Sequence, residues 1–139
     1  MPTAALVLHT ERDQAKALAR EIATWLHDRG WSVILPAADA KAAGLTEGAY
    51  DGEALPPDLD LVVSLGGDGT MLRTIHLVGG SGAPVLGVNV GQLGYLTEIE
   101  PAQTQSALER FVAGEQSNVT SSGKVLMRER QELVSYSVK

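Results

Sequence analysis

Short apolar runs alternate along this chain with segments in which apolar residues recur every three or four positions. A continuous apolar run between polar residues is typical of a strand buried on both faces of a parallel sheet, and the longer spacing is typical of an amphipathic helix. Strands are expected at residues 4–8, 31–35, 59–65 and 84–90, and helices at residues 11–29 and 70–78. The repeated order predicts an α/β fold, an open and mostly parallel sheet flanked by helices, with a right-handed first crossover.

Local signals refine the ends of these elements. Thr10 is placed to cap the first helix, and Gly30 follows that helix as a stop signal. Residues 36–57 have no sustained period and are expected to form a variable connection, except for a helical turn at residues 37–43.

The pattern changes after residue 100. A helix is expected at residues 104–113, followed by a polar linker at residues 117–123. Residues 133–139 alternate in polarity, which is typical of a half-exposed and usually antiparallel strand. We therefore expect an α/β nucleotide-binding domain over residues 1–100, and the connecting helix and first strands of a truncated β-rich domain over residues 101–139.

Composition restricts the class of protein. A chain of 139 residues, 44% hydrophobic and without cysteine, is typical of one globular domain with no disulfide. The formal net charge of −6 disfavours nucleic acid and anionic lipid as partners. The N-terminus lacks the pattern of a signal peptide and no apolar stretch approaches the roughly 20 residues of a membrane span. A cytoplasmic location is the resulting prediction.

A glycine-rich loop, Gly66 to Thr70, connects the third expected strand to its helix. Three glycines in four residues allow positive φ angles and a close approach of a ligand to the backbone, and a helix N-terminus attracts phosphate. The loop has no lysine, so it is not a Walker A loop. The sequence therefore favours a phosphate at this loop.

Asp68 within this loop needs its own explanation, because a carboxylate repels phosphate. It could hold a cation, accept a hydrogen bond from a hydroxyl group, or take a proton from an attacking hydroxyl. All three roles suit phosphoryl transfer to an alcohol. The alternative is a tight turn in which Asp68 only caps the helix.

A second loop, residues 89–98, follows the fourth expected strand. The Asn89 side chain can donate to and accept from ribose hydroxyls or an adenine edge, and Gly91 permits a tight loop beside the ligand. The alternative is a simple turn, with Tyr95 and Leu96 packed in the core.

Weaker candidates surround these loops. Arg73 is placed to pair with a phosphate, although an isolated arginine there is more often solvated. His9, at the end of the first strand, is a site contact or a histidine at the core edge. No grouping of metal ligands is evident, so no metal-binding residue is predicted. Other ionisable residues are interpreted as structural: His27, His76, Glu98 and Glu100.

The two loops together resemble a known family. Residues 66–70, Gly-Gly-Asp-Gly-Thr, resemble the motif of NAD kinases, diacylglycerol and sphingolipid kinases and, in related form, 6-phosphofructokinases. Residues 87–97, Gly-Val-Asn-Val-Gly-Gln-Leu-Gly-Tyr-Leu-Thr, resemble NAD kinases specifically, with Tyr95 where phenylalanine is usual. Residues 9–12 and 129–133 extend the resemblance.

The resemblance implies transfer of the terminal phosphoryl group of ATP, or of polyphosphate, to the 2′-hydroxyl of the adenosine ribose of NAD, giving NADP. Asp68 would be the catalytic base. Gly67, Gly69 and Thr70 would surround phosphate groups, and Asn89 with its loop would help to form the nucleotide site. A divalent cation, Mg²⁺ in the first instance, would accompany the donor.

The resemblance also implies a second domain beyond Lys139, so that residues 1–139 alone are expected to be inactive or nearly so. It implies a homo-oligomer for the full-length protein. Two alternatives stay open: a lipid kinase of the diacylglycerol or sphingolipid type, and a noncatalytic module that binds nucleotide without transferring phosphate.

Overall fold

The computed structural model describes residues 2–79, 81–90, 104–112, 123–129 and 132–138. Within these residues one seven-stranded sheet has the order β3-β2-β1-β4-β5-β6-β7. Its strands are β1 (Thr3–Leu8), β2 (Ser32–Pro36), β3 (Ala49–Tyr50), β4 (Leu61–Gly66), β5 (Val85–Asn89), β6 (Gly123–Glu129) and β7 (Glu132–Val138). Strands β1 to β5 run parallel to one another. Strand β6 runs antiparallel to both of its neighbours, β5 and β7. This architecture confirms the predicted α/β fold class.

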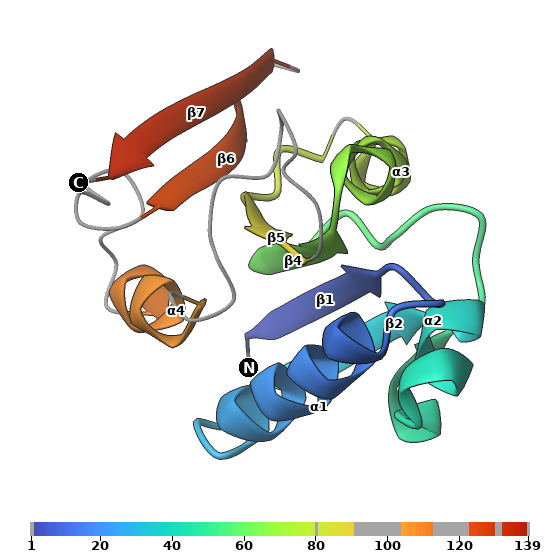
Figure 1. The fold of residues 1–139 in the computed structure, drawn as a ribbon. Coiled ribbons are helices and arrows are strands. Elements are labelled where there is room, and N and C mark those ends of the chain that lie inside the picture. The colour runs from blue at the N-terminus through green and yellow to red at the C-terminus, as the bar shows by residue number, and fades with distance from the viewer. Residues whose placement is uncertain (1, 80, 91–103, 113–122, 130–131, 139) are drawn as a thin grey trace.

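Helices cover both faces of the parallel strands (Figure 1). They are α1 (Asp13–His27), α2 (Ala37–Ala43), α3 (Asp68–Val78) and α4 (Thr104–Val112), with a 3₁₀ turn η1 (Thr46–Gly48) before β3. Helices α1 and α4 share one buried cluster with the strands, and α3 packs in a second cluster on the opposite face. The layers are therefore helix, sheet and helix.

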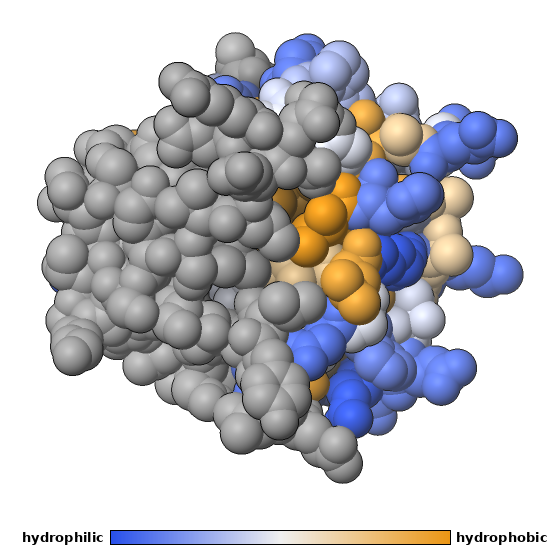
Figure 2. Space-filling model, turned by 90° about the horizontal axis from the view of Figure 1, so that it is seen from above, coloured by the Kyte–Doolittle hydropathy of each residue, from blue (hydrophilic) through white to orange (hydrophobic). Residues whose placement is uncertain are grey.

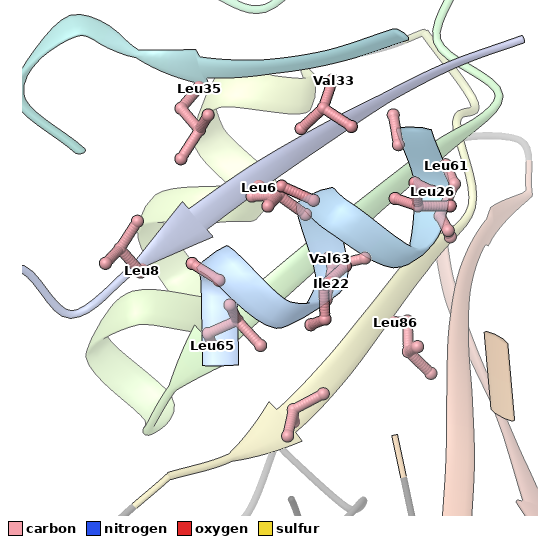
Figure 3. Close-up of a cluster of buried hydrophobic side chains, with 14 of the residues drawn as sticks. Leu6, Leu8, Ile22, Leu26, Val33, Leu35, Leu61, Val63, Leu65 and Leu86 are labelled. Carbon is pink, nitrogen blue, oxygen red and sulfur yellow. The ribbon is translucent and has the colours of Figure 1, made fainter. Parts of the chain in front are cut away.

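The two central strands are buried on both faces, as their continuous apolar runs predict. Along β1, Leu6 and Leu8 face the α1 side, whereas Val7 belongs to the cluster on the α3 side. Along β4, Leu65 faces α1 and Val62 faces α3. Figure 3 shows α1 lying across these strands, with its Ile22 and Leu26 side chains between the helix and the sheet. Both faces of these strands are therefore packed in the core, one against α1 and the other against α3.

The predicted stop signal after α1 is confirmed, whereas the predicted cap before it is wrong. Gly30 has a φ of 81° and follows the helix, as its stop signal predicts. The predicted cap at Thr10 is wrong, because α1 begins at Asp13 with Arg12 at its cap position and no side-chain cap. His9 occupies the turn instead: its Nδ1 atom accepts a hydrogen bond from the N–H of Glu11 at 3.2 Å.

Two strands had no counterpart in the sequence analysis. The two-residue β3 is too short to show a period, and β6 includes the end of the segment expected to be a linker. The predicted strand near the C-terminus is confirmed as β7, which pairs antiparallel with β6. Strand β6 in turn pairs with β5 in the same sheet. The predicted division after residue 100 falls outside the described residues and stays a prediction.

Polar residues dominate one side of the surface. In the view from above, Figure 2 shows hydrophilic residues along the right-hand side and hydrophobic residues gathered near the middle. Among the residues whose burial is described, the exposed large hydrophobic side chains are Leu72 and Val112. Within the described part of the chain, no helix has the length and apolarity needed to cross a membrane.

Leu6→Ala tests the buried centre of the sheet. Leu6 is fully buried, so the truncation should lower the free energy of unfolding by about 2–5 kcal/mol. Leu72→Ala is the matched control, because that side chain is 58% exposed, and it should change the value by less than about 0.5 kcal/mol. Urea unfolding followed by circular dichroism measures both. Equal effects of the two substitutions would contradict the assigned core.

Candidate functional site

The candidate site lies at the carboxyl ends of β1 and β4, the two strands at the centre of the sheet. The chain leaves β1 toward α1 and β2, and it leaves β4 toward α3 and β5, on the opposite side. Ligands of open α/β sheets bind at such a divergence, and we refer to the region between the carboxyl ends of β1 and β4 as the crevice. The N–H of His9 donates to the carbonyl oxygen of Leu65 at 2.9 Å, so the ends of the two strands stay joined up to the crevice.

The glycine-rich loop forms one rim of this crevice. Strand β4 ends at Gly66, Gly67 occupies the cap position of α3, and Asp68 is the first helical residue. No side-chain hydrogen bond caps α3, and the N–H of Met71 donates to the carbonyl oxygen of Gly67 at 3.0 Å. Asp68 therefore does not hold the cap position, which belongs to a residue without a side chain, and its role stays a prediction. The half-buried Asp68 carboxylate belongs instead to the first turn.

The three loop glycines serve two different purposes. A Cβ atom on Gly66 would lie 2.3 Å from the Thr70 hydroxyl oxygen, so the strand can carry only a hydrogen there. A Cβ atom on Gly67 or Gly69 would meet no atom within 4 Å. The expectation of positive φ angles in this loop is wrong, since the described glycines with positive φ are all elsewhere. Close packing and open space, rather than backbone conformation, explain these glycines.

Thr70 lies between the loop and the strand. Its side chain is buried against Gly66, and its carbonyl oxygen accepts a hydrogen bond from the Thr74 hydroxyl at 2.7 Å. The Thr74 hydroxyl also lies 3.0 Å from that of Ser64 on β4, and both side chains are fully buried. These contacts attach α3 to β4. Ser64 and Thr74 were not predicted from the sequence, although two hydroxyl residues among apolar neighbours were the available signal.

Asn89 stands next to the loop on the neighbouring strand. It is the last residue of β5 and pairs in register with Gly66. The Asn89 residue is only 6% exposed, and its Oδ1 atom has no hydrogen-bond partner among the described residues. A buried amide oxygen without a partner carries a desolvation cost that a donor from a ligand would offset. The predicted neighbour Gly91 lies outside the described residues.

Arg73 has a protein partner that the sequence did not predict. Its guanidinium group forms a two-pronged ion pair with the carboxylate of Asp39 on α2. It also donates to the carbonyl oxygen of Leu8 at 3.4 Å. Nothing in the alanine-rich sequence around Asp39 marks that residue as buried. Pairing of Arg73 with phosphate stays a prediction.

The other histidines and acids take no part in a described cluster. His27 and His76 lie on the exposed surfaces of α1 and α3. Glu98 and Glu100 fall outside the described residues. Within the described residues, no group of three or more histidine, aspartate or glutamate side chains is placed to hold a metal ion. His9 lies at the crevice edge, with its Nδ1 atom occupied by the turn.

This combination defines a class of protein: an open α/β fold with a glycine-rich strand-to-helix loop at its topological switch point, the arrangement of phosphate and nucleotide sites. Residues 4–116 match the family model for the ATP-NAD kinase N-terminal domain. The chain therefore belongs to the NAD kinase family.

Curated relatives agree with this assignment. The chain is 41% identical to an NAD kinase of Heliobacterium modesticaldum over 122 residues, which cover 83% of this chain and 40% of the relative. It is 40% identical to an NAD kinase of Syntrophotalea carbinolica over 101 residues, which cover 73% of this chain and 35% of the relative. The chain thus spans well under half the length of these relatives.

Solved structures share the fold. Yeast NADH kinase complexed with NADH superposes with a TM-score of 0.69 at 18% identity, covering 97% of this chain and 46% of that one. An NAD kinase from Archaeoglobus fulgidus in complex with ATP gives a TM-score of 0.57 at 24% identity, covering 81% of this chain and 37% of that one. At these identities the likeness establishes the fold.

Alanine substitutions separate the two kinds of loop glycine. Gly66→Ala should lower the free energy of unfolding by about 1–3 kcal/mol, because the new methyl group would overlap Thr70. Gly69→Ala, in open space on the first turn of α3, should change it by less than about 1 kcal/mol. Thermal unfolding of the two variants compares them directly. A larger loss for Gly69→Ala would contradict the described loop.

Proposed function

We propose that the protein is an NAD kinase, which transfers the terminal phosphoryl group of ATP to the 2′-hydroxyl of the adenosine ribose of NAD and yields NADP and ADP. The observation that carries the proposal is the position of the Gly66 to Thr70 loop at the switch point, with open space beside Gly67 and Gly69. Family membership and the ATP and NADH bound by the two structural relatives support it.

Asp68 is proposed as the catalytic residue. The ribose oxygen forms a new bond to the terminal phosphorus, the bond from that phosphorus to the bridging oxygen breaks, and ADP leaves with the bond electrons. The 2′-hydroxyl loses its proton in this step. A carboxylate in the first turn of α3 is suited to accept the proton, because it stands at the loop that faces the phosphates.

Backbone groups are proposed to hold the nucleotides. The first-turn amides at Gly67, Gly69 and Thr70 would face phosphate oxygens, since a helix N-terminus favours negative charge. The partnerless Oδ1 atom of Asn89 would accept a hydrogen bond from a ribose hydroxyl or an adenine amino group. Gly91 and His9 are proposed to border the same site.

A divalent cation, Mg²⁺, is proposed to accompany the donor. Among the described residues, Asp68 is the carboxylate at the glycine-rich loop, Asp39 is buried and paired with Arg73, and no cluster of metal ligands is found. This donor set fits Mg²⁺, which keeps several waters and binds through one or two carboxylates together with substrate phosphates. When bound, the ion neutralises negative charge on the transferring phosphoryl group.

The remaining properties of the whole protein are also proposals. The net charge of −6 disfavours nucleic acid as a partner, and small nucleotides are proposed as partners from the family likeness. A cytoplasmic location and a homo-oligomeric state are proposed from the family likeness. Polyphosphate is a second candidate donor.

A product assay on the full-length protein tests the activity. With NAD, ATP and Mg²⁺ supplied, we expect ADP and a product phosphorylated at the 2′ position, identified by phosphorus NMR and by a dehydrogenase specific for NADP. Parallel reactions offer polyphosphate as donor and diacylglycerol or sphingosine as acceptor. Preference for a lipid acceptor would establish the lipid kinase alternative, and nucleotide binding without product would establish the noncatalytic one.

Asp68→Asn tests the proposed base. Loss of the proton acceptor should lower kcat by about 10²–10⁴-fold. The fold should be retained, because Asp68 is half-buried at the start of α3 and lies outside the hydrophobic core. Asp58→Asn, at an exposed carboxylate in the loop before β4, is the matched control and should leave kcat unchanged. Near-normal NADP formation by Asp68→Asn would remove Asp68 from the role of base.

A further inference from the structure

Strand β1 continues beyond its neighbour β2 on one side. The registered pairs of β1 with β2 end at Ala5 and Ile34, whereas the pairs with β4 continue to Leu8 and Leu65. The N–H and carbonyl groups of Leu8 therefore extend past the last β2 pair at the edge where the crevice opens. Buried backbone groups of this kind need partners from elsewhere.

Two charged side chains supply these partners. The Oδ2 atom of Asp39 accepts a hydrogen bond from the N–H of Leu8 at 2.9 Å. Arg73 donates from Nη1 to the carbonyl oxygen of Leu8 at 3.4 Å and to the Oδ2 atom of Asp39 at 3.2 Å. Its Nη2 atom completes the pair with the Oδ1 atom of Asp39. Together the two side chains make the hydrogen bonds to Leu8 that a neighbouring strand would otherwise make.

The pair connects three elements of the crevice. Asp39 is fully buried on α2, Leu8 ends β1, and Arg73 lies on α3, five positions after Asp68. A buried carboxylate is stable only when its charge is paired, and the planar fork of arginine permits one geometry for such a pair. The orientation of α3 relative to the end of β1 is consequently restricted.

We propose that Asp39 and Arg73 are positioning residues, which hold the first turn of α3 and the end of β1 in the mutual arrangement that phosphoryl transfer requires. The inference rests on the proposed function. It gives Arg73 a role through Asp39 and Leu8, in place of a direct contact with phosphate.

Because Asp39 is buried, its substitution can show whether Arg73 acts through Asp39 or binds phosphate directly. A fully buried side chain, bonded to Leu8 and Arg73, can influence the reaction only through those partners. If the pair acts as one unit, loss of either member should have the same effect, and loss of both should be no worse. If Arg73 binds phosphate directly, its loss should weaken donor binding whether or not Asp39 is present.

The experiment compares Asp39→Asn, Arg73→Met, the double variant and Arg73→Lys in the full-length protein. The amide oxygen introduced by Asp39→Asn can still accept from Leu8, so the double variant removes both charges and leaves no unpaired one. Lys41→Met, which removes an exposed charge from α2, is the matched control. Steady-state kinetics with ATP and NAD give kcat and KM. The amide NMR shifts of residues 66–70 and of His9, and the Tm, are measured in parallel.

We expect each single variant to lower kcat by about 10–100-fold, the loss that a misplacement near 1 Å produces. The KM for ATP should change by less than about threefold, since ground-state binding is retained. The double variant should equal the single variants in kcat but exceed Arg73→Met in Tm, because Arg73→Met alone leaves the buried Asp39 carboxylate without its partner. Arg73→Lys should restore part of kcat, and the shifts of residues 66–70 should move alike in both single variants.

Other results overturn the proposal. A KM for ATP raised more than about tenfold by Arg73→Met but not by Asp39→Asn would make Arg73 a phosphate ligand. Recovery of kcat together with Tm in the double variant would reduce the pair to a structural role. If the wild-type protein makes no NADP, the proposed function fails. The amide NMR shifts test the positioning role without relying on activity. If the shifts of residues 66–70 do not change in the single variants, the positioning role is wrong as well.

Discussion

The parallel pairing of β1 with β4 is the constraint on which the rest of the structure depends. Both strands are apolar on two faces, and burying those faces under α1 and α3 holds the strands in register from Ala4 and Leu61 to Leu8 and Leu65. Because the strands run in the same direction, their ends meet at one edge. The hydrophobic core therefore determines where the glycine-rich loop and His9 come together.

Within five residues, the glycine-rich loop packs closely against α3 at one position and leaves open space at two others. Gly66 is required by the packing of Thr70, which together with Thr74 attaches α3 to β4. Gly67 and Gly69 leave the start of the helix uncovered. Since the same helix is fixed at its inner side and open at its N-terminus, a ligand would meet a surface that needs little rearrangement.

Most polar groups around the crevice are hydrogen-bonded within the protein, whereas the Asn89 side-chain oxygen has no partner among the described residues. The groups that fix α3 are all paired: the hydroxyls of Ser64 and Thr74, and the charges of Asp39 and Arg73. Asn89, by contrast, keeps an unpaired buried oxygen beside Gly66. Paired buried groups resist movement, whereas an unpaired one favours a partner from outside. This contrast separates the framework of the site from the surface that the proposed nucleotide would contact.

The sequence by itself determined the order of the main strands and helices along the chain, the stop at Gly30 and the two loops that follow the third and fourth expected strands, because periodicity and turn signals are local properties. It did not determine why each loop glycine is needed, since composition does not distinguish positive φ from close packing. It also did not show Asp39 as the partner of Arg73 or the pairing of β6 with β5. Those contacts join residues far apart in the chain, and only the packed sheet, with β1 extending beyond β2, leaves Leu8 in need of them.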